Sequence, residues 1–238
     1  MNSSALKSIH LSSMKAAAMP KAVLFDLDGT LVDTADDLGA ALNHVLQSHG
    51  LPLCSAEQYR PMASHGAKGL LELGFGPLLA NYDFGRLRQQ LLNYYALHVC
   101  DHSQHFPGGA ELIAHLNQHQ IPWGIVTNKP YRLAASMLKQ LPALSQCAIL
   151  LGGDSLAQRK PDPTPLLVAS YQLKVPAAQC WYVGDAERDI AAGNRAGMTT
   201  VLAEFGYIAN TDQTELWQAD LHIQSLMQLI AVCGTVSK

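Results

Sequence analysis

The sequence KAVLFDLDGTLVDT at residues 21–34 decides the fold of this chain. Its four apolar residues at 22–25 predict a short strand that is buried on both faces. Asp26 and Asp28 follow at once, and because they lie two residues apart in an extended backbone, they project to the same side. A buried strand that ends in two acids brings negative charge to the carboxyl edge of a sheet, where open α/β sheets bind their ligands.

Asp26 and Asp28 form a pair of carboxylates that needs a partner. Two like charges this close repel each other unless a cation or a shared proton intervenes, and hard divalent cations prefer oxygen ligands. Gly29 permits a backbone turn that other residues resist, and Thr34 followed by Asp37 predicts a capping box that opens a helix. The alternative is a surface turn rich in Asp, Gly and Thr, and the apolar strand before it argues against that interpretation.

The composition is that of a well-buried globular enzyme rather than a disordered chain. Hydrophobic residues make up 48% and charged residues 15% of the 238 residues, which allows a sizeable core. The net charge of −3 gives no electrostatic footprint for nucleic acid. No run of about 18 apolar residues predicts a membrane span. We therefore expect neither nucleic acid nor a membrane as a partner.

The cysteines and the N-terminal stretch indicate where the protein works and where its fold begins. The five cysteines are scattered and form no CxxC pair, which favours a reducing, cytoplasmic setting. Residues 1–18 are rich in Ser and Ala, with little periodicity and no apolar core of a secretory signal. We expect them to form a loosely ordered tail.

The rest of the chain divides into a helical part and an alternating part. Helical periodicity without any strand pattern predicts an all-helical cap domain at 34–104. After residue 105, helix and strand alternate, which predicts a parallel sheet of five or more strands covered on both faces, in a core domain made of 19–33 and 105–238. The expected strands are 121–127, 147–151, 180–185 and 199–203, and the expected helices are 108–119, 131–140, 163–173 and 187–196, the third with Asp162 as N-cap and Pro163 at its first position.

Two further sets of polar residues lie near the ends of predicted strands. One set ends a strand, and the other lies in the loop that follows a strand. Thr127 and Asn128 end the second strand, where a hydroxyl, an amide and free N–H groups suit a phosphate oxygen; an ordinary strand-to-helix cap is equally compatible with them. Lys160 lies in the stiff turn KPDP and can neutralise a phosphate; a solvated lysine in a helix-entry loop is the alternative.

Asp185 and Asp189 end the fourth expected strand and fall on one face if the helix has begun. Together with Asp26 they concentrate negative charge, which is costly without a cation. Acids at a helix N-terminus are favourable in their own right, so this pair alone leaves both interpretations open.

Four motifs in this order resemble those of the haloacid dehalogenase superfamily. They are DLDGTLV at 26–32, VTN at 126–128, KPDP at 160–163 and GDAERD at 184–189. The resemblance covers residues 21 to about 230, and it implies a Rossmann-like core with a helical cap between the first two motifs.

The resemblance also implies a role for each site residue. Asp26 would be the nucleophile that forms an aspartyl-phosphate, and Asp28 the general acid and then base. Lys160 would touch both the nucleophile and the phosphate, alongside the phosphate-binding Thr127 and Asn128. Mg²⁺ would be held by Asp26, the Asp28 backbone carbonyl and Asp185, with Asp189 anchoring the site from behind.

The activity that follows is a Mg²⁺-dependent phosphomonoesterase acting on a small phosphorylated metabolite. A phosphomutase of the same superfamily, acting on a sugar phosphate, is the alternative. Hydrolytic dehalogenation is disfavoured because a metal-free reaction has no need of Asp28 and Asp189. A phosphate-binding module without catalysis is disfavoured by the complete set of acids.

Substrate choice and assembly are less defined by the sequence. The whole chain resembles the phosphoglycolate phosphatase branch of the superfamily. Three stretches, His102–Gln104, Trp123–Pro130 and Phe205–Ile208, resemble bacterial N-acetylmuramic acid 6-phosphate phosphatases, which act in peptidoglycan recycling. Within the cap, His65 and Lys68 are expected to face the leaving group, although an ordinary helix-entry loop explains them equally well. The sequence indicates no oligomeric state.

Overall fold

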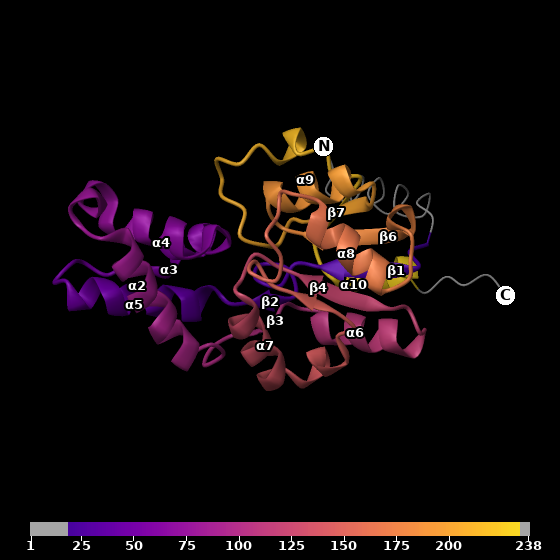
Figure 1. The fold of residues 1–238 in the computed structure, drawn as a ribbon, viewed down its shortest axis with the longest axis horizontal. Helices are drawn as coiled ribbons and strands as arrows, with labels where there is room; N and C mark the ends of the chain where they lie inside the picture. The colour runs from indigo at the N-terminus through magenta and orange to yellow at the C-terminus, as the bar shows by residue number, and fades with distance from the viewer. Residues whose placement is uncertain (1–18, 234–238) are drawn as a thin grey trace, which may run out of the picture.

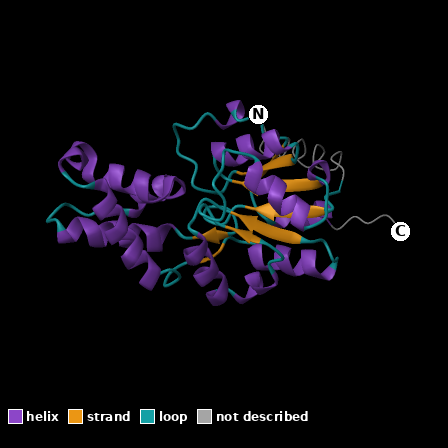
Figure 2. Cartoon of the chain, viewed as in Figure 1, coloured by secondary structure: helices purple, strands orange, loops and turns teal. Residues whose placement is uncertain are grey.

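The computed structural model describes residues 19–233, so the tail expected at 1–18 lies outside the described residues. Within this range a parallel six-stranded sheet lies between two layers of helices, and a separate group of helices lies to one side (Figures 1 and 2). The predicted α/β class and the parallel sheet of five or more strands are confirmed. Across the sheet the strands are β5 (Leu150–Leu151), β4 (Trp123–Val126), β1 (Ala22–Phe25), β6 (Cys180–Gly184), β7 (Thr199–Ala203) and β8 (Leu221–Ile223).

Strand β1 lies in the interior of the sheet and pairs in parallel with β4 and β6. All four of its residues are buried. Val23 and Phe25 belong to one apolar cluster, and Ala22 and Leu24 to the other. Each face of the strand therefore contacts a different helical layer, which explains its uninterrupted apolar sequence.

The two layers are formed by helices that connect the strands. One face is covered by α6 (Gly109–Gln118), α7 (Tyr131–Gln140) and α10 (Met227–Cys233). The other is covered by α8 (Thr164–Gln172) and α9 (Glu187–Ala196). Short 3₁₀ helices occur in the connections at Pro142–Gln146, Ala177–Gln179 and Thr214–Leu216.

Residues 35–97, which we call the helical block, contain helices and their connections only. In it α2 packs against α4 and α5, and the block extends away from the sheet (Figure 1). Within residues 19–233, no helix has both the length and the apolar character that crossing a membrane requires. The elements of the block are α2 (Ala35–Ser48), α3 (Ala56–Tyr59), η1 (Arg60–His65), α4 (Gly66–Phe75), η2 (Gly76–Asn81) and α5 (Phe84–Leu97).

A two-stranded ribbon joins the block to the sheet. Strand β2 (Val32–Asp33) pairs antiparallel with β3 (Gln104–His105), and Val32 lies opposite His105. The chain therefore leaves the sheet and returns to it at adjacent points. Strands of two residues are too short to show an alternating pattern, which is why the sequence did not predict this ribbon.

The predicted capping box at the start of α2 is wrong. Thr34 makes no side-chain cap bond, and its backbone N–H donates instead to the phenol oxygen of Tyr207. The Asp37 carboxylate accepts hydrogen bonds from the backbone N–H groups of His102 and Ser103, each at 2.9 Å. Distant segments thus supply the partners that the local pattern assigned within one helical turn.

The start of α8 also differs from the prediction by one residue. The helix begins at Thr164, with Pro163 at the N-cap position. The Asp162 carboxylate accepts a hydrogen bond from the Thr164 backbone N–H at 2.8 Å. Asp162 therefore stabilises the helix start, but from one position further out than expected.

Candidate active site

Three acids meet at the carboxyl edge of the sheet. Asp26 follows β1 directly, Asp185 follows β6, and Asp189 lies in the first turn of α9. One carboxylate oxygen of each lies within 4.8 Å of the others, and all three side chains are buried. Residues more than 150 positions apart thus form one acidic cluster, because neighbouring parallel strands end at the same edge.

Lys160 lies between two of these acids. Its Nζ is 3.0 Å from Asp26 Oδ1 and 2.8 Å from Asp189 Oδ1, and the lysine side chain is only 1% exposed. It also donates to the Val126 carbonyl at 2.9 Å and to the Tyr182 hydroxyl at 2.7 Å. The predicted contact between Lys160 and Asp26 is therefore present, and it is part of a buried polar network.

The three acids differ in their proton affinity. Burial, together with the nearby charges of Asp189 and Asp26, raises the pKa of Asp185 to about 7. Burial also raises the pKa of Asp26, although Lys160 opposes the rise. At Asp189 burial acts in the same direction, but Lys160 and Arg188 outweigh it and the pKa is lowered.

Asp185 is held by neutral donors. Its Oδ1 accepts from the Thr30 hydroxyl at 3.1 Å, and its Oδ2 accepts from the Tyr207 backbone N–H at 2.9 Å and the Ser64 hydroxyl at 2.8 Å. Gly29 has a φ of 82°, and a Cβ at this position would overlap the Asp185 carboxylate, so only glycine fits. The position of the Asp185 carboxylate is therefore fixed by these contacts, while its negative charge remains unfavourable because the group is buried and its donors are neutral.

The donor set fits a hard divalent cation. Carboxylate oxygens are the ligands that Mg²⁺ prefers, and buried like charges favour either a proton or a cation among them. Asp26 and Asp185 both have raised pKa values, while Asp189 is satisfied by Lys160 and by the Ala186 backbone N–H at 3.0 Å. The geometry thus separates two acids available to a cation from one that supports the site from behind.

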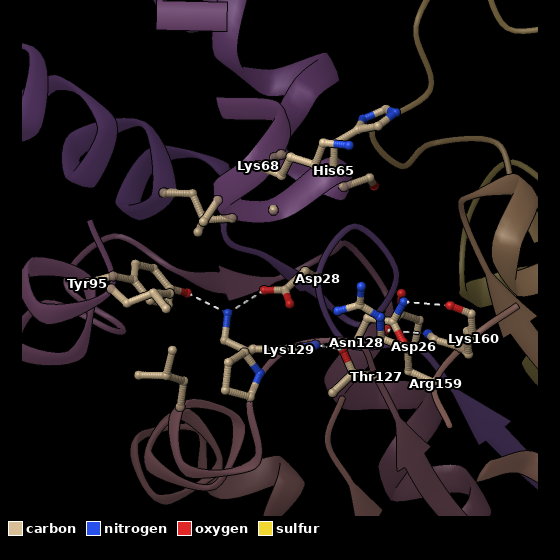
Figure 3. A pocket seen from close by; sticks show the side chains of 18 of the residues that line it. Asp26, Asp28, His65, Lys68, Tyr95, Thr127, Asn128, Lys129, Arg159 and Lys160 are labelled. Atoms are coloured by element: carbon tan, nitrogen blue, oxygen red, sulfur yellow. Dashed lines mark hydrogen bonds and ion pairs between the residues drawn. The ribbon is translucent and has the colours of Figure 1, made fainter. Parts of the chain in front are cut away.

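The Asp28 side chain points away from this acidic cluster. Its Oδ1 lies 2.7 Å from the Nζ of Lys129, which also donates to the Tyr95 hydroxyl at 2.7 Å (Figure 3). The carboxylate therefore lines the cavity beside Lys129 rather than joining the acidic cluster. Any ligand role for Asp28 would fall to its backbone carbonyl, as the sequence motif implies.

Thr127 and Asn128 lie beside Lys160 and line the same cavity. The Thr127 hydroxyl accepts from the Lys129 backbone N–H at 3.2 Å, and the Asn128 amide donates to the Lys160 carbonyl at 2.9 Å. The buried Oδ1 of Asn128 has no hydrogen-bond partner among residues 19–233. Both side chains are therefore placed near the nucleophile candidate, with polar capacity left for a ligand.

A cavity of about 440 Å³ lies between the sheet edge and the helical block. His65 and Lys68 lie on the wall formed by the block, across the cavity from Asp28 (Figure 3). The Lys68 side chain is 73% exposed and its Nζ is 3.8 Å from Glu72 Oε1. Both residues therefore line the cavity on the side of the helical block.

Four site residues make contacts that were not predicted from the sequence. Arg188 has its Nη2 3.9 Å from Asp26 Oδ2, and Lys129 contacts Asp28. Ser64 and Tyr207 both bind Asp185. Arg188 and Lys129 directly neighbour recognised motif residues, so their charge was an available signal, whereas the other two are brought in by tertiary structure.

The fold is a parallel α/β sheet, and its carboxyl edge carries a cluster of acids bridged by a lysine. This combination is typical of an α/β enzyme whose active site can bind a divalent cation. The chain belongs to the haloacid dehalogenase-like hydrolase family, whose model matches residues 23–203.

Two named relatives within this family are phosphatases. The chain is 45% identical over 210 residues to phosphoglycolate phosphatase from Xanthomonas campestris, covering 88% of this chain and 95% of that protein. It is 37% identical over 212 residues to N-acetylmuramic acid 6-phosphate phosphatase from Pseudomonas aeruginosa, covering 89% and 94%.

Solved structures share the fold. A crystal structure described as a predicted phosphoglycolate phosphatase from Haemophilus somnus superposes with a TM-score of 0.81 at 26% identity, covering 90% of this chain and 98% of that chain. The superfamily expected from the motifs is therefore confirmed.

Proposed function

We propose that this protein is a Mg²⁺-dependent phosphomonoesterase that transfers a phosphoryl group to Asp26. The phosphatase class follows from the family and from its curated relatives. The observation that carries the proposal is the placement of Lys160 within 3.0 Å of both Asp26 and Asp189, which form one buried cluster with Asp185. Phosphoryl transfer mainly requires alignment and stabilisation of charge, which is what these groups can provide.

The cation would be held by the Asp26 carboxylate, the Asp28 backbone carbonyl and the Asp185 carboxylate. Asp189 would keep Lys160 and the α9 N-terminus in place. When bound, the cation would neutralise charge on the phosphoryl oxygens and lower the repulsion between the acids.

The protein's own groups would carry out two steps. In the first, Asp26 forms a bond to phosphorus as the bond to the alcohol oxygen breaks, and Asp28 gives that oxygen a proton. In the second, Asp28 takes a proton from water, whose oxygen attacks phosphorus and releases Asp26. Lys160, Thr127 and Asn128 would stabilise the phosphoryl oxygens throughout.

For the substrate we propose 2-phosphoglycolate or N-acetylmuramic acid 6-phosphate, the compounds in the names of the relatives. The predicted cap domain at 34–104, which contains the helical block, would exclude water from the site, and His65 and Lys68 would contact the leaving group. All five cysteines are free, which supports a reducing compartment such as the cytoplasm.

The test is phosphate release from both compounds, with Mg²⁺ and with EDTA, by the wild-type protein and by Asp26→Asn. We expect Mg²⁺-dependent release that Asp26→Asn abolishes while circular dichroism and melting stay close to wild type. Turnover by Asp26→Asn at the wild-type rate would refute the nucleophile. A requirement for a sugar bisphosphate, with transfer instead of release, would favour the phosphomutase alternative.

A further inference from the structure

Lys129 connects the proposed general acid to the helical block. Its Nζ lies 2.7 Å from Asp28 Oδ1 and 2.7 Å from the hydroxyl oxygen of Tyr95, which belongs to α5 (Figure 3). The Lys129 side chain is 5% exposed and that of Asp28 is 16% exposed. The ammonium group is therefore shared between the sheet edge and the block.

Tyr95 is a firm acceptor for this lysine. It is among the most completely buried large side chains of the described chain, and burial raises its pKa well above the ordinary value, so its hydroxyl is neutral. α5 in turn packs against α2 and α4. The position of the Tyr95 hydroxyl, and with it the hydrogen bond to Lys129, therefore depends on where the helical block lies.

The ion pair with Lys129 fixes the direction in which the Asp28 carboxylate points. The Asp28 carboxylate is free to rotate about its side-chain bonds, and a charge-assisted hydrogen bond to a nearly buried ammonium restricts it. General acid catalysis requires the acid within hydrogen-bond reach of the oxygen that leaves. Lys129 holds Oδ1 of Asp28, so Oδ2 would carry the proton that the acid gives, and the lysine would set the direction in which Oδ2 points.

We propose that Lys129 is a positioning residue that orients Asp28 toward the leaving-group oxygen, and that Tyr95 makes this orientation depend on the placement of the helical block. This inference rests on the proposed function, because it takes Asp28 as the general acid. The proposed role of Lys129 is separate from phosphate binding and from the acidic cluster, because its contacts are with Asp28 and Tyr95.

The experiment compares two substrates of similar shape, phenyl phosphate and p-nitrophenyl phosphate. Phenolate leaves poorly without a proton, whereas nitrophenolate leaves readily. kcat/KM reports the steps up to departure of the alcohol, so hydrolysis of the phosphoenzyme does not obscure it. The variants are Lys129→Met and Tyr95→Phe, which preserve most of the buried volume, and the double variant.

We expect Lys129→Met to lower kcat/KM about tenfold more for phenyl phosphate than for p-nitrophenyl phosphate, since general acid–base catalysis contributes roughly 10²–10⁴-fold and misorientation forfeits part of it. Tyr95→Phe should shift the ratio the same way by less, and the double variant should shift it no further than Lys129→Met alone, because the residues act as one unit. Lys139→Met and Tyr171→Phe, both on the exposed surface, should leave the ratio unchanged.

An equal loss on both substrates would overturn the inference, since a structural defect has no reason to distinguish leaving groups. An additive double variant would overturn the part assigned to Tyr95. The proposed function is checked separately with Asp26→Asn: turnover of either ester by that variant at the wild-type rate would refute the nucleophile, whatever the effect of Lys129→Met.

Discussion

Ser64, in the helical block, donates a hydrogen bond of 2.8 Å to Asp185, which lies 121 residues further along the chain. The block is thereby bound directly to one acid of the candidate metal site. A hydroxyl on η1 thus completes the set of hydrogen bonds around a carboxylate that the sheet alone would leave partly unsatisfied.

Ser64→Ala is expected to loosen this attachment. Hydrogen bonds to charged groups contribute about 1.5–3 kcal/mol, and because Ser64 is only partly buried we expect a loss of about 1 kcal/mol in the free energy of unfolding. Urea denaturation measures it, with the exposed Ser145→Ala as the matched control. Identical midpoints for the two variants would show that the bond contributes no stability.

Lys160→Met is expected to destabilise the protein severely. It leaves Asp26 and Asp189 without the ammonium that now lies within 3.0 Å of both, and breaking a buried pair in this way costs about 3–5 kcal/mol. Mg²⁺ should raise the melting temperature of this variant more than that of the wild type, because the cation supplies the missing positive charge. The exposed Lys139→Met serves as the control in the same melts.

Stability without metal should fall as the pH rises. The pKa of Asp185 is raised from 3.8 to about 7 by burial, so the folded protein binds this proton more tightly than the unfolded chain does. The free energy of unfolding therefore decreases between about pH 4 and pH 7 and levels off above that range. Melting in EDTA across this range checks the direction, and Asp185→Asn should reduce the slope.

Mg²⁺ should counteract this loss, because it favours the charged carboxylate. The increase in melting temperature on adding Mg²⁺ is expected to be larger at pH 8 than at pH 5. An increase of the same size at both pH values would show that the cation does not compete with the Asp185 proton.

Lys68→Ala should affect substrates according to their leaving groups. Its exposed ammonium lies on the cavity wall opposite Asp28, so we expect KM for 2-phosphoglycolate, which carries a carboxylate, to rise several-fold, as loss of about 1 kcal/mol of binding would produce. KM for p-nitrophenyl phosphate should change little. Parallel changes on both substrates would contradict a role for Lys68 in specificity.

Much of the sheet domain could be predicted because its strands and helices are encoded by short, continuous sequence patterns. Residues 22–25 are apolar without interruption, and the helices at 131–140 and 187–196 have the predicted bounds. The shared edge of parallel strands predicted that Asp26 and Asp185 would lie close together, and the resemblance to the superfamily motifs added Lys160 to this site.

The remaining contacts depend on tertiary placement. The sequence around Ser64 does not indicate its contact with Asp185, and Asp37 matched a capping pattern while its true partners lie near residue 102. Lys129 was visible beside Asn128, but its role depends on Tyr95 lying next to it in space. Such pairs join segments whose separation in sequence carries no periodic signal.

The ribbon of β2 and β3 has an evolutionary consequence. Val32 and His105 are paired across this ribbon. The segment between them is therefore joined to the sheet domain at two adjacent points. A recombination event could exchange that insert as a single cassette, or lengthen it, without redirecting the strands that carry the acids. Relatives with one chemistry could in this way acquire new substrates by replacing the insert alone.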